Sequence, residues 1–378
     1  MRETPPSGGL VLAVDVGGTK LAAALVEPGG RLAAYDRVAT PNPAAPDAGG
    51  LDAERLWRTL AAQLDKLLAD AGDPPLAGVG VGCGGPMTWP AAEVSPLNIP
   101  AWRDFPLRAR LRARYSGLPV RIHNDAICVA VGEHWRGAGR GRDNVLGMVV
   151  STGVGGGLIL GGRLVNGGSG NAGHIGHVVV DPGGPPCACG GRGCLEAVAR
   201  GPALVAWARE QGWRCGSPGR TASADRTGGA DRTGGADRTG GADRTGGADR
   251  MGGVDRLGSS DRMGSHGRTG RAASGVELTA DARRGHPVAV AAMRRAGRAI
   301  GIAIASATHL CDLDVAAIGG GLSQAGSLLF DPLEEAFRTH ARLEFARRVR
   351  IVPAALGQTA GLVGAAALVF AHDRYWTG

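Results

Sequence analysis

The stretch Leu10-Val-Leu-Ala-Val-Asp-Val-Gly-Gly-Thr-Lys-Leu-Ala-Ala-Ala-Leu-Val26 joins two short apolar runs through a polar turn that contains two glycines. Apolar runs of this length, bounded by turn residues, predict one strand at 10–16 and a second at 21–26. Strand, Gly-Gly turn and strand in immediate succession predict a hairpin near the start of the chain.

The turn itself, Asp15-Val-Gly-Gly-Thr-Lys20, has two interpretations. The glycines Gly17 and Gly18 expose backbone N–H groups, Thr19 offers a hydroxyl and Lys20 a positive charge, so the turn could bind phosphate while Asp15 holds Mg²⁺ through water. An ordinary β-turn is the alternative. Phosphate binding is favoured because the chain uses two lysines, Lys20 and Lys66, against 40 arginines.

The same pattern returns in the middle of the chain. A strand predicted at 144–150 is followed by Ser151-Thr-Gly-Val-Gly-Gly-Gly157, and a further strand resumes at 158–160. Two such turns indicate two similar halves whose turns face one nucleotide.

Strands and helices are predicted to alternate along the rest of the chain, which indicates an α/β architecture. The further strands expected are 76–87, 120–125, 315–323 and 349–353, and the helices are 51–71, 107–115, one from near Ala126, 195–212, 278–312 (one or two helices), 328–338 and 359–371.

A glycine-rich loop, residues 170–196, brings three cysteines close to two histidines. The spacing is His177-x9-Cys187-x-Cys189-x4-Cys194. Three thiolates and one imidazole form a tetrahedral set that suits structural zinc. A glycine-rich loop that merely contains cysteines is the alternative, and the close spacing favours zinc.

Asp125 ends the apolar run Val120-Arg-Ile-His-Asn-Asp125 and precedes a predicted helix. A carboxylate there can cap the helix N-terminus. It can also act as a general base whose apolar neighbours, Ile122 and Ile127, tune its pKa. The residues alone favour the cap and leave the general base open.

Composition and charge narrow the class of protein. At 378 residues, the chain has room for two domains, and with 4% aromatic residues their cores must be built from Ala, Val and Leu. The net charge of +8 is scattered, so charge predicts no nucleic-acid surface. Seven cysteines, three of them in one loop, indicate metal and free thiols rather than disulfides. The first residues lack a signal-peptide core, and the apolar stretch 299–311 is too short for a bilayer, so a soluble, cytoplasmic protein is expected.

From Asp225 an Asp-Arg-Thr-Gly-Gly-Ala hexad recurs and the composition changes sharply. Because this repeat has no aromatic residues and little to bury, residues 217–274 are predicted to be a disordered insertion. A calcium-binding repeat is the alternative, but an arginine beside each aspartate argues against it. The role of the insertion is not predicted.

In their order and spacing, these motifs resemble those of the ROK family of sugar kinases, of which bacterial glucokinase is the best-known type. The likeness covers about residues 10–216 and 276–371. The motifs that carry it are Asp15-Val-Gly-Gly-Thr-Lys20, Asn124-Asp125-Ala126, Ser151-Thr-Gly-Val-Gly-Gly-Gly157, the loop ending in Cys194-Leu-Glu196, and Ile318-Gly-Gly-Gly321.

The resemblance implies a two-domain, actin-like α/β fold of the hexokinase and Hsp70 superfamily, with sugar and Mg·ATP in the cleft between the domains. Residues 10–120 with 359–378 would form the small domain. Residues 121–216 with 275–358 would form the large domain, which carries the zinc loop.

It also implies ATP-dependent phosphorylation of a hexose hydroxyl, usually that on C6 of glucose or a close relative, with Asp125 as general base. The implied cofactors are ATP, Mg²⁺ and structural Zn²⁺, and the implied site residues fall into three groups. The sugar would contact Gly85, Asn124, His174, His177 and Glu196; ATP would contact Asp15, Gly17, Gly18, Thr19, Lys20, Thr152, Gly153, Gly320 and Gly321; zinc would be bound by His177, Cys187, Cys189 and Cys194.

Three departures from the family pattern bear on the substrate. His174 replaces the usual second Glu of Glu-Ala-Gly-Glu-x-Gly-His, His123 replaces a Glu, and Gly84 replaces a Pro. Imidazole can donate as well as accept hydrogen bonds, so His174 leaves the identity of the sugar open. An N-acetylhexosamine, another amino sugar or a cyclitol is the alternative to glucose.

The family also contains sugar-sensing repressors with an N-terminal DNA-binding segment. Only nine residues precede the first predicted strand, so a non-catalytic regulator is the less favoured expectation. The resemblance also implies a homodimer, although the sequence does not determine the oligomeric state.

Overall fold

In the computed structural model, which describes residues 8–41, 52–216 and 274–376, two sheets of five strands share one topology. In the first sheet, central β1 (Leu10–Val16) pairs antiparallel with β2 (Lys20–Val26) and parallel with β4 (Leu76–Cys83). The outer strands are β3 (Leu32–Ala39), beside β2, and β5 (Val120–Asn124), beside β4.

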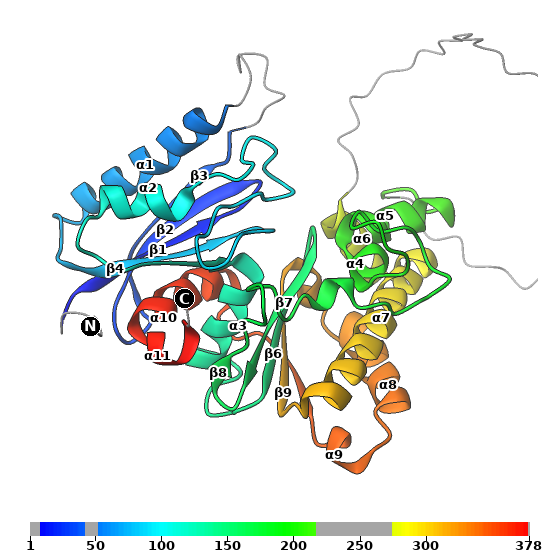
Figure 1. The fold of residues 1–378 in the computed structure, drawn as a ribbon. Helices are drawn as coiled ribbons and strands as arrows, with labels where there is room; N and C mark the ends of the chain where they lie inside the picture. Colours follow the sequence, from blue (N-terminus) through cyan, green and yellow to red (C-terminus); the bar gives the residue numbers. More distant parts are fainter. Residues whose placement is uncertain (1–7, 42–51, 217–273, 377–378) are drawn as a thin grey trace, which may run out of the picture. The chain divides into compact units, whose positions relative to one another are not determined.

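The second sheet repeats this order of strands (Figure 1). Central β6 (Val145–Val150) pairs antiparallel with β7 (Val154–Leu160) and parallel with β9 (Val315–Gly319). The outer strands are β8 (Arg163–Leu164) and β10 (Arg350–Pro353). The predicted α/β class and the two similar halves are therefore confirmed, while the predicted domain boundaries stay a prediction.

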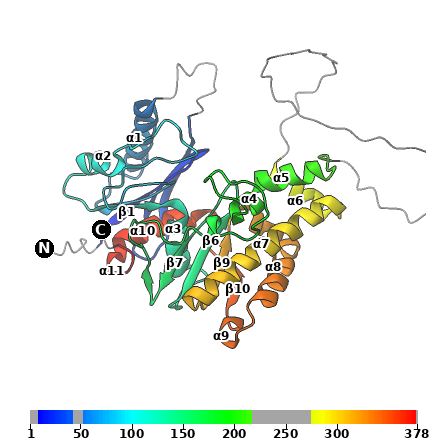
Figure 2. The same ribbon diagram turned by 45° about the vertical axis from the view of Figure 1, so that its right-hand side comes forward.

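Helices cover both sheets, and Figure 2 shows them from a second direction. They are α1 (Ala53–Asp70), α2 (Leu107–Arg114), α3 (Asp125–Arg136), α4 (Leu195–Ala199), α5 (Gly201–Glu210), α6 (Gly275–Arg283), α7 (Pro287–Cys311), α8 (Ser327–His340), α9 (Glu344–Arg347), α10 (Ala360–Phe370) and α11 (His372–Tyr375), with 3₁₀ turns η1 (Ile175–His177), η2 (Gly321–Ala325) and η3 (Gly357–Thr359). None of these helices is long and apolar enough to cross a membrane.

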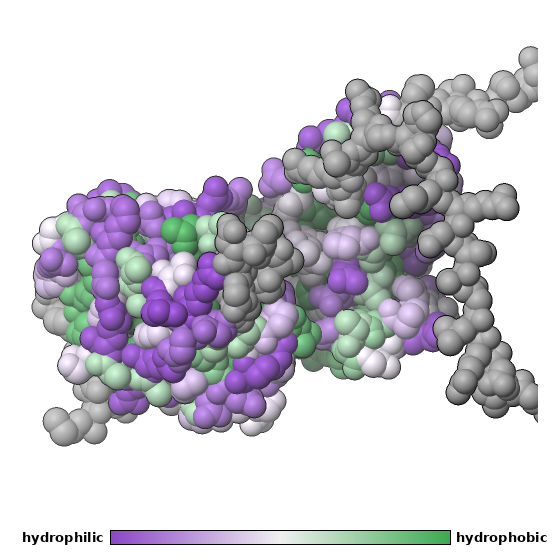
Figure 3. Space-filling model, turned by 90° about the horizontal axis from the view of Figure 1, so that it is seen from above, coloured by the Kyte–Doolittle hydropathy of each residue, from purple (hydrophilic) through white to green (hydrophobic). Residues whose placement is uncertain are grey.

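Alternation along β1 places its side chains in two separate cores. Leu12 and Val14 pack with Leu56 and Leu60 of α1, whose outer surface is largely hydrophilic (Figure 3). Val11 and Ala13 point to the other face, into a core built mainly from α3 and α10. The second sheet packs against α7 and α8 through a third core, which includes Met148 and Ile300.

Helices α3 and α10 cross so closely that glycine is required at the contact. A Cβ on Gly364 would lie 1.6 Å from the carbonyl oxygen of Cys128, and one on Gly132 would lie 2.3 Å from that of Ala360. Helix α3 also packs on strands of both sheets, so its N-terminus, at Asp125, is fixed from several sides.

Several predicted boundaries were wrong. Strand β7 begins at Val154 rather than 158, because Val154 pairs directly with Val150. The helix predicted at 195–212 divides at Arg200, because Pro202 cannot donate to the carbonyl of Val198. Strand β9 ends at Gly319, before the predicted 323.

The short elements β3, β8, α9 and α11 were not predicted. The predicted insertion 217–274 lies outside the described residues except for Ser274. The Ser274 side chain and that of Glu277 form a capping box at the start of α6.

Candidate active site

Asp125 is the first residue of α3, directly after the end of β5. The N-cap is Asn124, whose Oδ1 accepts a hydrogen bond from the Ala126 N–H at 3.0 Å. The prediction that Asp125 caps this helix was therefore wrong by one residue. Asp125 Oδ1 accepts a second hydrogen bond from the same N–H at 2.8 Å, so the carboxylate is held at the helix N-terminus.

Two carboxylates influence each other at this point. Burial raises the pKa of Asp125, against the opposing effects of the Ala126 N–H and of His174. Burial, followed by repulsion from Asp125, raises the pKa of Asp15 to about 6, and attraction to Lys20 opposes this. Asp15, Lys20 and Asp125 are thus close enough to interact, although more than a hundred residues separate the first turn from α3.

The first glycine turn is closed by backbone hydrogen bonds. Gly17 donates to the Lys20 carbonyl at 3.0 Å, and Lys20 already belongs to β2. Thr40 follows β3 and makes two hydrogen bonds to the turn. Its hydroxyl donates to the Gly17 carbonyl at 2.6 Å, and its backbone N–H donates to the Thr19 carbonyl at 3.1 Å. The turn is therefore held from both sides.

Asn98 lies against this turn and was not among the predicted site residues. A Cβ on Gly18 would lie 2.8 Å from the Asn98 carbonyl oxygen, and one on Gly84 would lie 3.3 Å from Asn98 Oδ1. The sequence signal was the frame of Pro96 and Pro100, which holds a polar side chain in a rigid loop.

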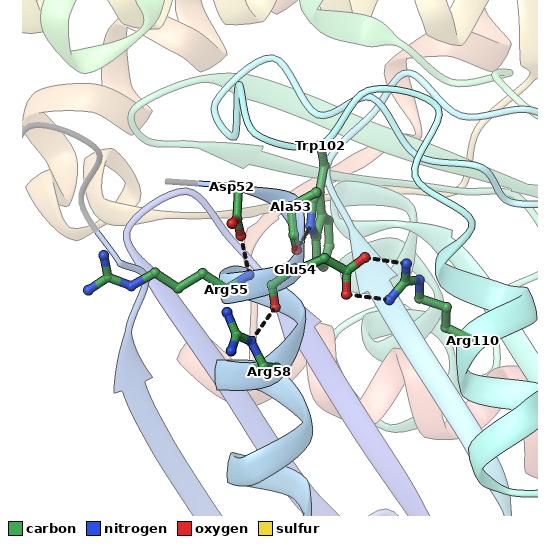
Figure 4. A network of polar contacts seen from close by, with 7 residues as sticks. All are labelled: Asp52, Ala53, Glu54, Arg55, Arg58, Trp102 and Arg110. Carbon is green, nitrogen blue, oxygen red and sulfur yellow. Dashed lines mark hydrogen bonds and ion pairs between the residues drawn. The ribbon is translucent and has the colours of Figure 1, made fainter. Parts of the chain in front are cut away.

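The loop that carries Asn98 is fixed at its far end by Trp102. This buried indole donates to the Ala53 carbonyl at the start of α1 at 3.2 Å, beside an ion pair between Glu54 and Arg110 (Figure 4). The position of Asn98 thus depends on the packing of α1.

Gly85 connects this loop to the end of β5. A Cβ on Gly85 would lie 3.2 Å from Asn124 Nδ2, and the Gly85–Pro86 peptide bond is cis. The structure therefore brings together Gly18, Asn98, Gly85 and Asn124, from four separate parts of the chain.

The second turn is shorter than predicted and consists of residues 151–153. Ser151 donates to the Gly153 carbonyl at 2.8 Å, and Thr152 lies between them. The glycines that follow belong to β7 and serve packing, since a Cβ on Gly155 would lie 2.6 Å from the Ala126 Cβ. Of the predicted glycine run, only Gly153 therefore lies in the turn itself.

Glu196 and Gly320 both border this second turn. Glu196 Oε2 accepts a hydrogen bond from the Val154 N–H at 2.9 Å. Gly320 has a φ of +92°, and a Cβ there would lie 2.3 Å from the Val150 carbonyl oxygen. Gly321 follows, and its Cβ position lies 3.8 Å from Ser151 Oγ.

The cysteine loop folds back on itself and gathers the four predicted metal ligands. One ligand atom from each of His177, Cys187, Cys189 and Cys194 lies within 4.8 Å of the others. Cys189 Sγ and Cys194 Sγ are 3.7 Å apart, too far for a disulfide. Zinc–sulfur bonds of about 2.3 Å in a tetrahedron place two sulfurs about 3.8 Å apart, so the donor set fits zinc.

His174 lies three residues before His177, the predicted metal-ligand histidine. Its Nδ1 donates to the Asn171 carbonyl at 2.7 Å, so in the neutral ring Nε2 is an acceptor. The rings of His174 and His177 are 6.3 Å apart and nearly parallel. His174 is exposed, and its effect on the pKa of Asp125 places it near that carboxylate.

Comparison with known proteins gives concordant matches. The model of the ROK family matches residues 11–372. The glucokinase of Streptomyces coelicolor is 32% identical over 366 residues, covering 97% of this chain and 99% of the relative. The N-acetylmannosamine kinase of Salmonella typhimurium is 39% identical, but over 199 residues, which cover 53% of this chain and 64% of the relative.

Among solved structures, the fold is similar to a ROK family glucokinase from Streptomyces griseus in complex with glucose and AMPPNP. The TM-score is 0.69 and the sequence identity 32%, with 95% of this chain and 99% of that chain covered.

Proposed function

Because the chain belongs to the ROK family, we propose that it transfers the γ-phosphoryl group of ATP to a hydroxyl of a hexose, with Asp125 as the general base. The similarity to glucokinases over nearly the whole chain supports this activity. The observation that carries the proposal is that Asp125 lies beside the first glycine turn: Asp15 pairs with Gly82 on the neighbouring strand, and a Cβ on Gly82 would lie 3.4 Å from the Asp125 Cα.

Asp125 would take the proton of the sugar hydroxyl as that oxygen attacks the γ-phosphorus. Its position at the start of α3 favours the ionised carboxylate, while burial makes the group a stronger base than a solvated aspartate. Asn124, one residue before it, would bind an adjacent sugar hydroxyl. Phosphoryl transfer depends mainly on positioning and charge, which a rigid strand-to-helix junction supplies.

The two glycine turns would hold the nucleotide. Gly17, Gly18, Thr19 and Lys20 would face the β- and γ-phosphates, and Thr152 with Gly153 would bind phosphate from the second sheet. Gly320 and Gly321, beside the second turn, would contact adenosine. Mg²⁺, when bound with ATP, would neutralise phosphate charge, and Asp15 is the carboxylate suited to hold it through water.

The sugar would lie between Gly85, Asn124 and the cysteine loop. We propose that zinc on His177, Cys187, Cys189 and Cys194 fixes this loop, so that His174, His177 and Glu196 are held towards the sugar hydroxyls. Val154, which donates to Glu196, would keep that carboxylate oriented before the sugar binds.

An Asp125→Asn variant tests the assignment of the base. Asparagine keeps the Oδ1 acceptor for the Ala126 N–H, so the fold should persist while turnover falls about 10²- to 10⁴-fold. Sugar binding, measured by calorimetry, should remain. Asp331→Asn, at an exposed position on α8, is the matched control and should leave turnover unchanged. Turnover of Asp125→Asn within about threefold of the unmodified protein would exclude Asp125 as the base.

A second substrate class has support of its own. His174 stands where the family usually has a Glu, and the similarity to an N-acetylmannosamine kinase is higher in identity, though over half the chain. An imidazole could accept the N–H of an acetamido group through Nε2, as the bond from His174 Nδ1 to Asn171 leaves that atom an acceptor.

A coupled assay of ADP release decides between these substrates. Glucose, mannose, allose, N-acetylglucosamine and N-acetylmannosamine would be compared by kcat/KM. The highest value for a neutral hexose supports a glucokinase-like enzyme, and the highest value for an acetamido sugar supports the second class.

We also propose a homodimer, on the family resemblance alone; light scattering should then give about twice the chain mass of 38.3 kDa.

A further inference from the structure

A buried histidine and an asparagine join the end of β5 to the segment that leads into His174. We propose that His123 and Asn166 form a positioning pair for the sugar site, holding Asn124 and that segment in fixed relation. The inference rests on the proposed sugar kinase activity. Neither residue would touch the substrate.

The hydrogen bonds of His123 fix its tautomer. Its Nδ1 accepts the backbone N–H of Asn124 at 2.9 Å, so Nδ1 must carry the lone pair. Nε2 then carries the hydrogen and donates to Asn166 Oδ1 at 2.6 Å. His123 is fully buried, and Asn166 is 8% exposed. Burial lowers the pKa of His123 to about 4, so the ring stays neutral and keeps the Asn124 bond at neutral pH.

Asn166 anchors the chain that follows β8. Its carbonyl oxygen accepts the N–H of Ala172 at 3.1 Å, which closes residues 166–172 into a compact loop. The next residue but one is His174, whose ring is tied to Asn171 at 2.7 Å. A shift of Asn166 would therefore be passed to His174.

Trp89 packs the same loop against His123. The rings of Trp89 and His123 have centroids 5.0 Å apart. A Cβ on Gly170 would lie 2.8 Å from the Trp89 Cβ, so that loop and the indole are in direct contact. His123 is thus linked to the proposed sugar site in two ways. It is hydrogen-bonded to Asn124 on one side and to Asn166, which begins the 166–172 loop, on the other.

The test separates positioning from folding by comparing two buried histidines. His123→Phe keeps an aromatic ring beside Trp89 and removes both hydrogen bonds, and Asn166→Leu keeps the His123 ring but removes the acceptor for its Nε2. His134 is the matched control, because it is also buried, accepts from the Tyr375 hydroxyl through Nδ1 and donates to the Arg142 carbonyl through Nε2. His134→Phe should lower thermal stability without changing the geometry of the proposed sugar site.

We expect His123→Phe and Asn166→Leu each to raise the sugar KM about tenfold or more, because small displacements of binding groups are costly. The KM for ATP should stay within about twofold, and the double variant should add little to either single change. His134→Phe should lower the melting temperature by a similar amount to His123→Phe, but it should leave the KM for sugar and the KM for ATP unchanged.

Three results would overturn the pairing: an unchanged sugar KM in the single variants, an equal rise in both KM values, or the same rise in His134→Phe. If His123→Phe does not fold, Asn166→Leu alone decides. Failure of the proposed function is distinguishable, because the unmodified protein would then phosphorylate none of the sugars tested.

Discussion

Glu196 accepts a hydrogen bond from the backbone N–H of Val154 at 2.9 Å, so the start of α4 is joined directly to the second glycine turn. A Cβ on Gly153 would lie 3.0 Å from the same carboxylate oxygen. One side chain, carried at the end of the cysteine loop, therefore borders both the proposed sugar site and a proposed phosphate site.

Two substitutions of Glu196 should separate these roles. Glu196→Gln keeps an acceptor for Val154 and loses the charge, so we expect a higher sugar KM and an unchanged KM for ATP. Glu196→Ala leaves the Val154 N–H unpaired, at about 1–3 kcal/mol, and should raise the KM for ATP by about fivefold or more as well. Steady-state kinetics with each substrate varied measures both values. Identical profiles for the two variants would contradict a role of Glu196 at the second turn.

Gly18 should tolerate no side chain, because a Cβ would lie 2.8 Å from the Asn98 carbonyl oxygen and 2.9 Å from the Asn98 Cβ. Gly18→Ala must displace either the first turn or the loop at 96–102, and we expect kcat/KM to fall by about 10²-fold. Gly29→Ala, at a position with open space around its Cβ, is the control and should retain full activity. Equal activity of the two variants would show that the turn adapts freely.

Zinc removal should loosen the cysteine loop. We expect about one zinc per chain by plasma mass spectrometry, since four donors form a closed structural set. Cys194→Ser should lose the metal, lower the melting temperature and raise the sugar KM. Cys215→Ser, at an exposed cysteine outside the cluster, should change none of these. A purified protein with a zinc ratio near zero and full activity would refute the site.

Activity should depend on pH through Asp15 and Asp125. The pKa of Asp15 is raised to about 6 by burial and then by Asp125, and the pKa of Asp125 is also raised by burial. Both carboxylates act in the ionised form, so kcat/KM should fall as the pH drops below about 6. A profile that stays flat down to about pH 5 would contradict this coupling.

The raised pKa of Asp15 has the opposite consequence for stability: activity should rise with pH, whereas the free energy of unfolding should fall. The pKa of Asp15 is higher in the folded protein than the 3.8 of a solvated aspartate, so folding favours the protonated form, and stability is lost as the pH rises through about 6. Asp15→Asn should therefore melt at a higher temperature than the unmodified protein at pH 8. The difference should shrink as the pH falls below about 6 and vanish below about pH 3, where the Asp15 carboxyl is protonated in both the folded and the unfolded protein. Asp331→Asn again provides the control.

Much of the fold could be predicted from the sequence, because its signals are local. The apolar runs around Asp15-Val-Gly-Gly-Thr-Lys20 and around the second turn give both hairpins, and the repeated pattern indicates the repeated sheet. The spacing of Cys187, Cys189 and Cys194 limits how a short loop can arrange them, so the clustering of these cysteines could also be expected, while the zinc itself stays a prediction. The sequence correctly placed Asp125 between a strand and a helix, but the prediction that it is the N-cap of that helix was wrong.

Only the tertiary structure decided the contacts between distant segments. Three contacts join residues that are tens of positions apart in the sequence, and no periodicity links such pairs. They are the contacts of Asn98 with Gly18, of Glu196 with Val154 and of His123 with Asn166. The run Gly155-Gly-Gly157 shows the same limit: its composition favours a phosphate loop, yet at Gly155 the close approach of α3 explains the glycine. Secondary structure follows from neighbours along the chain, whereas the site is set by how α3, α4 and the loops pack in space.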